Sequence, residues 1–175
     1  MLAHWNARGL NHKAAVLKMK MKELGVDVCG IAKSYTYSDS HISDDKWIWD
    51  PGTENRPNPT QHNPPGGIGV VVSRGVSHSI VAADKHCVWV RLELEGGTPV
   101  FFGECYFPHS TNIRQHRLGW TEVAERAREF AEVGHVVLMG DFNAHVGLHG
   151  DTTDAAGRIA ASPGKGAQTP HVEWH

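Results

Sequence analysis

The sequence predicts an α/β protein, and three observations support this class. Residues 1–32 read as strand, helix and strand, residues 67–107 hold a run of strand candidates, and a second amphipathic helix then leads into another apolar strand. The chain has 175 residues, of which 40% are hydrophobic and 21% are charged. This length and composition are enough for the core of one globular domain, and they exclude a disordered tail.

The first elements are a strand, a helix and a buried strand. Residues 1–6 read as a strand that runs into a loop. The helix predicted over 13–24 has one apolar face, made by Leu17, Met21 and Leu24. Residues 26–32 form a nearly continuous apolar run, which is typical of a strand buried on both faces.

The segment from residue 38 to residue 67 has a different composition. It is rich in Pro, Asn and Gly, so most of it can be neither a helix nor a central strand. Trp47, Ile48 and Trp49 are the candidate for a short strand within it. The Pro-rich part, 51–67, is predicted to be a surface loop, and a loop that covers a ligand is the alternative.

Three strand candidates follow, at 67–73, 87–94 and 99–107. They are predicted to be consecutive antiparallel strands joined by Gly-rich turns. The second alternates apolar residues with others, which predicts a strand with one buried face.

A second helix is predicted over 112–133, and a buried strand over 135–140. The helix has an apolar stripe made by Trp120, Val123, Ala127 and Phe130. Residues after 152 have neither the helical nor the strand period.

Charge and cysteine content restrict the environment. A formal net charge of −2 argues mildly against a strong nucleic-acid binder. No segment approaches the roughly 20 apolar residues that cross a bilayer, so no membrane partner is expected. The three cysteines, at positions 29, 87 and 105, are scattered. They suggest neither a disulfide framework nor a zinc knuckle, and a reducing compartment, nuclear or cytoplasmic, is the better expectation.

Polar side chains follow several of the predicted strands. Asn6 comes after the first, Tyr106 and His109 end another, and Asp141 and Asn143 follow the last. A carboxylate is a suitable ligand for a hard divalent ion such as Mg²⁺, and an amide can donate to a phosphate oxygen. Taken alone, Asp-x-Asn is more often a turn that ends a strand.

Four motifs in order resemble one family. They are WNARGL at 5–10, GGIGV at 66–70, YFPH at 106–109 and GDFNA at 140–144. Over residues 1–158 they resemble the endonuclease/exonuclease/phosphatase family. The similarity is greatest to the endonuclease domains of non-LTR retrotransposon reverse transcriptases.

The resemblance implies a four-layer α/β sandwich, in which two facing mixed β-sheets are flanked by helices. It also implies phosphodiester hydrolysis dependent on Mg²⁺ or Mn²⁺, with DNA as substrate and a reverse-transcriptase domain as a possible partner. Asn6 and Asp141 would be the metal residues. Asp141, Asn143 and Tyr106 would be catalytic: Asp141 orients the attacking water, while Tyr106 and Asn143 bind the phosphate.

The sequence departs from this family at the metal site. The family has a Glu-Thr pair after its second strand, and the Glu is the principal metal ligand. Here the aligned pair is Lys33-Ser34, and a lysine cannot coordinate Mg²⁺. Metal binding and hydrolysis are therefore expected to be impaired. The alternative is a misplaced alignment, with acidic substitutes at positions 39, 44 and 45.

The second departure is at the C-terminus. The Ser-Asp-His motif of the family does not occur, so residues 1–158 are expected to form an incomplete domain and residues 159–175 an irregular tail. A truncated or frame-shifted fragment that lacks the C-terminal strands would explain this. Such a fragment would leave a sheet edge uncovered, which predicts marginal stability or self-association.

Three functions remain open. The first is an impaired DNA endonuclease, with basic residues near the N-terminus and on the second helix as local phosphate-binding patches. The alternative interpretation of these residues, favoured for the second helix, is a solvated helix face. The second is an inactive remnant that still binds nucleic acid, and the third is a phosphatase acting on a small substrate. The WNARGL motif argues against the third.

Overall fold

The computed structural model describes residues 1–10, 12–35, 42–52, 67–94, 96–107 and 113–143. These residues form eight strands and two helices. In chain order they are β1 (Leu2–Asn6), α1 (Ala14–Leu24), β2 (Val28–Ala32), β3 (Trp47–Pro51), β4 (Ile68–Ser73), β5 (His78–Ala83), β6 (Cys87–Leu92), β7 (Val100–Tyr106), α2 (Ile113–Ala131) and β8 (His135–Asp141).

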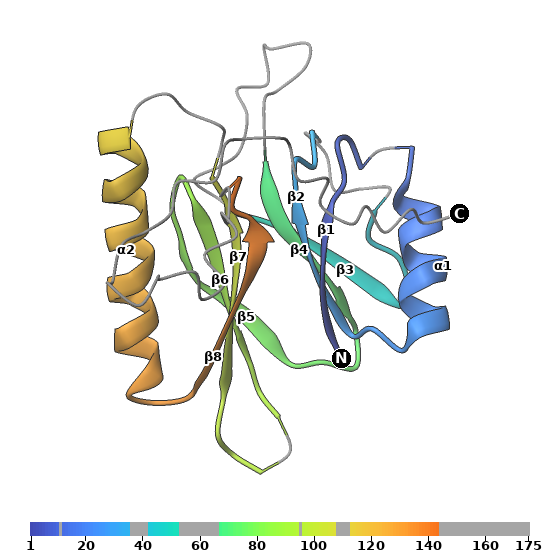
Figure 1. Cartoon of the computed structure of the whole chain (residues 1–175). Helices are drawn as coiled ribbons and strands as arrows, with labels where there is room; N and C mark the ends of the chain where they lie inside the picture. Colours follow the sequence, from blue (N-terminus) through green and yellow to red (C-terminus); the bar gives the residue numbers. More distant parts are fainter. Residues whose placement is uncertain (11, 36–41, 53–66, 95, 108–112, 144–175) are drawn as a thin grey trace, which may run out of the picture. The chain divides into compact units, whose positions relative to one another are not determined.

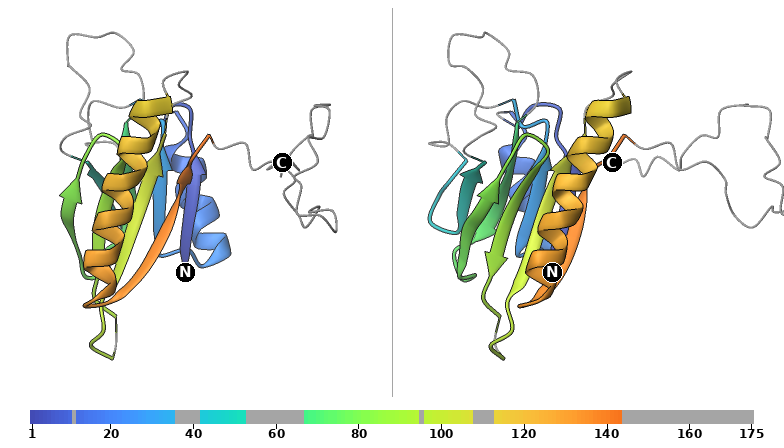
Figure 2. Two further views of the ribbon diagram at one scale, coloured as in Figure 1. Left: turned by 60° about the vertical axis from the view of Figure 1, so that its left-hand side comes forward. Right: turned by 90° about the vertical axis from the view of Figure 1, so that its left-hand side faces the viewer.

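The strands form two mixed four-stranded sheets, in the orders β1-β2-β4-β3 and β5-β6-β7-β8. In each sheet one pair is parallel, β1 with β2 and β7 with β8, and the other pairs are antiparallel. The sheets face each other, α1 covers the outer face of the first, and α2 covers the outer face of the second (Figures 1 and 2). The predicted α/β sandwich of two mixed sheets flanked by helices is therefore confirmed for the described residues.

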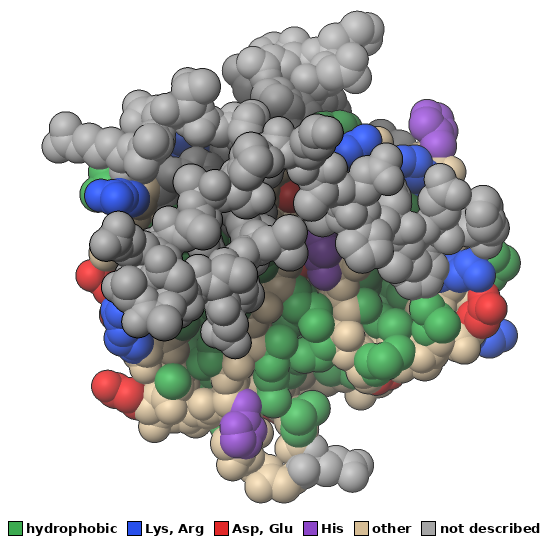
Figure 3. Space-filling model, in the orientation of Figure 1, with side chains coloured by type: hydrophobic (Ala, Val, Ile, Leu, Met, Phe, Trp, Pro, Cys, Tyr) green, Lys and Arg blue, Asp and Glu red, His purple; other side chains and the backbone are tan. Residues whose placement is uncertain are grey.

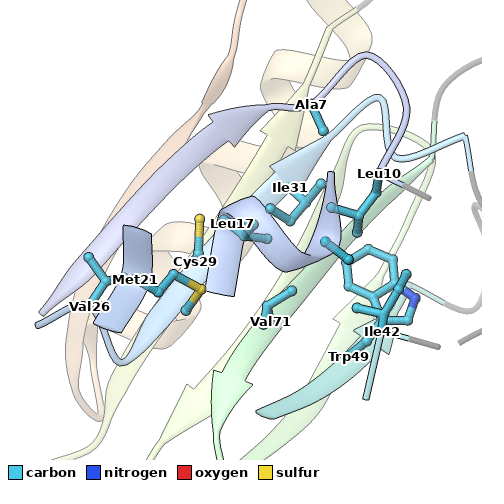
Figure 4. Packing of buried hydrophobic residues seen from close by; sticks show 11 residues of the cluster. Ala7, Leu10, Leu17, Met21, Val26, Cys29, Ile31, Ile42, Trp49 and Val71 are labelled. Atoms are coloured by element: carbon cyan, nitrogen blue, oxygen red, sulfur yellow. The ribbon is translucent and has the colours of Figure 1, made fainter. Parts of the chain in front are cut away.

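The strict period of two in the strands produces this layering, because successive side chains point to opposite faces. Three apolar layers result. One lies under α1, where Leu17 and Met21 pack on Ile31 and Val71 (Figure 4). The layer between the sheets is formed mainly by valines of β2, β4 and β6 together with Phe102 of β7, and the third lies under α2.

Several sequence-based expectations need correction. Strand β5, which lies between β4 and β6 in the sequence, was not predicted. Strands β4 and β6 are therefore not paired neighbours, because β4 belongs to the first sheet and β6 to the second. Strand β6 is buried on both faces, since Trp89 packs under α2 while its neighbours in sequence pack between the sheets. Leu24 of α1 is exposed, and Ala14 is buried in its place. The other predicted elements are confirmed to within two residues for most bounds.

Strands β1 and β8 are the edge strands on one side of the two sheets, and they contact each other across the gap. We call this side the open edge, because no other described strand pairs with either of them there. Half-buried apolar side chains of Leu2, Val137 and Met139 lie along it. Figure 3 shows hydrophobic side chains gathered on the lower part of this face.

No described helix is long and apolar enough to cross a membrane. The three cysteines are free thiols and are buried. The predicted Pro-rich loop lies almost entirely outside the described residues, and the expected irregular tail lies wholly outside them.

Candidate functional site

The C-terminal ends of β1, β2, β7 and β8 meet at one end of the sandwich, which we call the site end. Each of the two parallel pairs brings its last residues to the same level, Asn6 beside Ala32 and Tyr106 beside Asp141. Polar groups at the carboxyl ends of strands are held by the sheet while they remain open to a ligand. The sequence-predicted residues Asn6, Tyr106, Asp141 and Asn143 all lie at this end, whereas His109 is outside the described residues.

Asp141 is the centre of the arrangement. Its Oδ2 accepts a hydrogen bond from Asn6 Nδ2 at 2.6 Å and forms an ion pair with Lys33 Nζ at 2.9 Å. Its Oδ1 accepts the backbone N–H of Asn143 at 3.2 Å. These contacts join the two sheets at the site end, since Asn6 and Lys33 belong to the first sheet and its turn while Asp141 ends the second.

Lys33 is positioned by its backbone. It follows β2 directly and has a φ of 54°, in the left-handed region. Its carbonyl oxygen accepts the N–H of Gly9 at 2.9 Å, and the carbonyl oxygen of Ser34 accepts that of Leu10 at 2.7 Å. Two backbone hydrogen bonds thus fix the turn that directs Lys33 to Asp141.

The site end also holds unusual backbone. Four described residues other than glycine have positive φ, namely Arg8, Lys33, Tyr35 and Asn143. They lie in the turns after β1, β2 and β8, so all four are at the site end. Left-handed conformations cost a non-glycine residue about 1 kcal/mol or more, and they concentrate at functional sites. This clustering is therefore a second indication that the site end is a functional site.

Tyr106 lies beside the ion pair, with Lys33 Nζ 5.0 Å from the centre of its ring. Burial raises the pKa of the Tyr106 phenol, and the nearby Lys33 ammonium partly opposes the shift. The phenol therefore keeps its proton at neutral pH and can donate a hydrogen bond to an anionic oxygen.

Asn143 reaches the site through its backbone, while its side chain fixes the loop. Its Nδ2 donates to the carbonyl oxygen of Phe107 at 2.7 Å. Below this contact the ring of Phe107 stacks on Trp120 at 4.6 Å, and Trp120 stacks on Phe142 at 5.3 Å. The aromatic stack under α2 thereby supports the segments that carry Tyr106 and Asp141.

A scan of the sequence against protein-family models finds no match, and a search of the curated proteins finds no relative. The solved structures do contain similar folds. The chain superposes on an endonuclease/exonuclease/phosphatase family protein from Bacteroides thetaiotaomicron with a TM-score of 0.59 at 12% identity, over 81% of this chain and 62% of that one.

Two further structures are similar at the same level. The mannosyl-6-phosphatase Bt3783 of Bacteroides thetaiotaomicron VPI-5482 gives a TM-score of 0.56 at 12% identity, over 81% of this chain and 64% of that one. Truncated TDP2 of Caenorhabditis elegans gives 0.57 at 13% identity, over 81% and 61%. The chain has the endonuclease/exonuclease/phosphatase fold. It spans less than two thirds of the length of each of these three structures.

The side chains at the site end can be tested for their fit to the divalent metal that the sequence resemblance implies. Asn6 Oδ1 is buried and has no hydrogen-bond partner among the described residues, and such an oxygen is a suitable metal ligand. The carboxylate of Asp141, however, is already paired with the Lys33 ammonium. Among the described residues, no group of three or more His, Cys, Asp or Glu side chains is placed to hold an ion. As they stand, these side chains do not fit a divalent metal.

Of the proposed acidic substitutes for Lys33, Asp44 is bound by other residues. Asp44 is exposed and is bound by Lys18 Nζ at 2.6 Å and by the N–H of Lys46 at 2.9 Å. These hydrogen bonds, Lys18 first, lower the pKa of Asp44 to about 2. Asp39 is outside the described residues. Asp44 thus has a local structural role.

The predicted basic patch near the N-terminus is also partly used within the protein. Lys13 Nζ donates to the carbonyl oxygen of Ala7 at 2.6 Å, which supports the turn after β1. Lys20 pairs with Glu23 one turn along α1, at 2.9 Å. Arg8, in the turn after β1, is exposed.

Sequence reasoning missed one pair of polar residues close to the site. His4 Nδ1 lies 2.8 Å from Oε1 of Glu104, and the Glu104 side chain is completely buried. A charged residue in the otherwise apolar strand β7 was the available signal. It was hidden because Glu104 lies directly before Cys105 and the recognised Tyr106 motif.

Proposed function

We propose that this chain is a phosphodiester-binding domain of the endonuclease/exonuclease/phosphatase family, of the retroelement DNA endonuclease type, whose hydrolytic step is strongly impaired. The observation that carries the proposal is the 2.9 Å ion pair between Lys33 Nζ and Asp141 Oδ2 at the site end. It sits where the sequence resemblance calls for a metal-bound carboxylate.

The arrangement favours a phosphate ester as ligand. Tyr106 keeps its proton and can donate to a phosphate oxygen, and the Lys33 ammonium supplies a positive charge beside it. Lys33 side-chain exposure is 16%, so its charge is only partly screened by water. A ligand phosphate would compete with Asp141 for the same ammonium.

The hydrolytic step needs a carboxylate that positions or deprotonates a water. Both oxygens of Asp141 are occupied, Oδ2 by Asn6 and Lys33 and Oδ1 by the Asn143 backbone. An ammonium at this position cannot carry an activated water as a divalent ion does. Binding of Mg²⁺ or Mn²⁺ would require Lys33 to leave Asp141, so the proposal includes weakened metal dependence.

A plasmid-nicking assay tests the proposal. Supercoiled DNA is incubated with Mg²⁺ or Mn²⁺ and the wild-type chain, Lys33→Glu, Lys33→Gln or the double variant Lys33→Glu/Asp141→Ala. Nicking by the wild type should stay near background. Lys33→Glu should raise it about 100-fold, which is part of the several kcal/mol that a metal supplies.

Two controls make the result specific. Lys33→Gln removes the charge without adding a carboxylate, so it should not nick, and the double variant should lose the gain. Nicking by the wild type at the level of Lys33→Glu would overturn the impairment. If duplex DNA bound with equal affinity to wild type, Tyr106→Phe and Asn143→Ala, the proposed binding site would be wrong.

A fully inactive, nucleic-acid-binding remnant is the second candidate, and the same ion pair favours it. It predicts DNA binding with no nicking by any of these variants. A small-substrate phosphatase is the third, since one similar fold is a mannosyl-6-phosphatase. Turnover of a phosphomonoester without nicking would favour it.

The partners in this proposal are DNA, a reverse-transcriptase domain of a parent element and a second copy of the chain. Self-association is proposed through the open edge, where no other described strand pairs with β1 or β8 and half-buried apolar side chains lie. Light scattering tests it. A concentration-dependent dimer that disappears on Val137→Lys is expected, and a monomer at all concentrations would contradict it.

A further inference from the structure

One buried polar pair is not used by the proposed function. His4 of β1 and Glu104 of β7 meet across the gap between the two sheets, with 2.8 Å between Nδ1 and Oε1. The Glu104 side chain has no exposed surface, whereas 23% of the His4 side chain is exposed. The second oxygen of Glu104, Oε2, is buried and has no partner among the described residues. Burial of a carboxyl group with one unpartnered oxygen costs stability, so its presence calls for an explanation.

The surroundings of Glu104 are shaped to receive it. Gly30 lies at the centre of β2, directly opposite His4 in the parallel register. A Cβ on Gly30 would lie 1.9 Å from Glu104 Oε2 and 2.9 Å from the Phe102 ring. The absence of a side chain at position 30 therefore creates the space into which the carboxylate of the other sheet extends.

The pair lies one step below the site along both strands. His4 and Asn6 are two residues apart on β1, and Glu104 and Tyr106 are two residues apart on β7. Because side chains repeat every two residues, each pair of neighbours points to the same face. The inward faces of β1 and β7 thus each carry one member of the buried pair and one residue of the site.

We propose that His4 and Glu104 are positioning residues for this site. Their hydrogen bond ties β1 to β7 across the gap and so fixes the separation at which Asn6 and Tyr106 stand around Asp141. The ligand in this inference is the phosphodiester of the proposed function, on which it rests, but the positioning itself is a property of the unliganded protein.

The pair occupies a strongly electrostatic position. Glu104 is faced by His4 of β1, Cys29 of β2, Cys87 of β6 and Asp141 of β8. Burial raises the pKa of Glu104 to about 7, His4 opposes the shift, and Asp141 adds to it. The two thiols stay protonated, since burial raises the pKa of Cys29 to about 12 and that of Cys87 well above its ordinary value. The charge of the pair consequently changes near neutral pH.

Nuclear magnetic resonance of the full chain tests the positioning directly. The side-chain amide of Asn6 and the ring of Tyr106 are followed from pH 5.5 to pH 8.5 in the wild type and in Glu104→Gln, in which the carboxamide can still bond to His4. In the wild type both signals should move with one common midpoint. In Glu104→Gln this movement should be much smaller, because the buried carboxyl group of the pair is gone.

Binding of a short DNA duplex gives the second readout. Glu104→Leu, which cannot bond to His4, should weaken binding about tenfold, whereas Glu104→Gln should stay within about twofold of the wild type. Met139→Ala, at the position paired with Glu104 on β8, is the packing control and should leave the Asn6 and Tyr106 signals in place. If Glu104→Leu does not fold, the pH titration of the wild type against Glu104→Gln decides alone.

The outcomes separate the two proposals. Absence of DNA binding by the wild type would overturn the proposed function while leaving the resonance test intact. Signals of Asn6 and Tyr106 that ignore pH in the wild type, or that move equally in Glu104→Gln, would overturn the positioning role. Equal effects of Glu104→Leu and Met139→Ala on both readouts would reduce the pair to ordinary packing and also overturn it.

Discussion

Two polar pairs bridge the same two sheets, and they differ in how their charge is held. At the site end Lys33 meets Asp141, with 16% and 17% of the side chains exposed. Two residues deeper His4 meets Glu104, which is wholly buried. The first pair joins the Lys33 ammonium to a carboxylate close to solvent. The second pair can gain or lose a proton near neutrality, since the pKa of Glu104 is about 7.

The difference indicates a division of roles. A fixed charge near solvent suits attraction of an anionic group, whereas a buried group of variable charge suits control of the separation between strands. A glycine lies next to each pair: Gly140 directly precedes Asp141 on β8, and Gly30 of β2 faces the Glu104 carboxylate from the other sheet. Four predictions probe this comparison.

The largest effect is expected from Gly140→Ala. Gly140 has a φ of 148°, and a Cβ there would lie 2.0 Å from the backbone oxygen of Cys105. Backbone cannot yield as a side chain can, so we expect a loss of about 3–4 kcal/mol in the free energy of unfolding. Gly30→Ala, which meets the end of the Glu104 side chain, should cost about 2 kcal/mol. Urea denaturation measures both, and the reverse order would contradict the comparison.

The second effect is the pH dependence of stability. Between pH 4.5, the ordinary pKa of the group, and pH 7, folded Glu104 keeps a proton that the unfolded chain has released. Raising the pH through this range should therefore destabilise the fold, by about 3 kcal/mol from this group. Denaturation at pH 5 and pH 7.5, compared with Glu104→Gln, measures the difference. Identical slopes for the two proteins would refute the assignment.

A smaller effect is expected from Lys33→Met, which keeps the length of the side chain but removes its charge. Asp141 would keep its Asn6 hydrogen bond and lose its counter-charge, so unfolding should become easier by about 1.5 kcal/mol. A variant more stable than wild type at pH 7 would mean that desolvation of the pair outweighs its attraction.

The smallest effect is expected from Lys20→Ala on α1. Lys20 and Glu23 form an exposed ion pair one helical turn apart, and such pairs contribute about 0.3 kcal/mol. A thermal melt should shift by less than about 2 °C, and high salt should remove the difference. This variant is the matched control for Lys33→Met, and a comparable loss would show that burial does not distinguish the two pairs.

Much of the fold was predictable because its signals are local. The apolar run of β2 and the helical stripe of α2 can each be recognised within a short segment of sequence, and both are confirmed. Strand β5 was missed because it alternates half-buried and exposed residues at a sheet edge, with few bulky apolar side chains. The division of β4 and β6 between two sheets was missed because a local sequence pattern does not show which strands pair with each other.

The site was predicted in part for the same reason. Asn6, Tyr106, Asp141 and Asn143 stand in recognisable motifs at strand ends, and the structure brings them to one end of the sandwich. Their predicted chemical roles stay predictions. The ion pair of Lys33 with Asp141 depends on a left-handed turn, and the His4–Glu104 pair depends on space left by Gly30. Neither contact can be inferred from residues that are close together in the sequence.

The hydrogen bond between Asn6 and Asp141 has a consequence for the order of folding. It joins residues 135 positions apart, and the Lys33 and His4 contacts span 108 and 100 positions. Contacts of such separation require the closure of a long loop, which costs entropy, so we expect them to form late in folding. During synthesis from the N-terminus, a chain that has not yet docked β8 would have a first sheet but no site. Docking of β8, the last described strand, is therefore expected to complete the site.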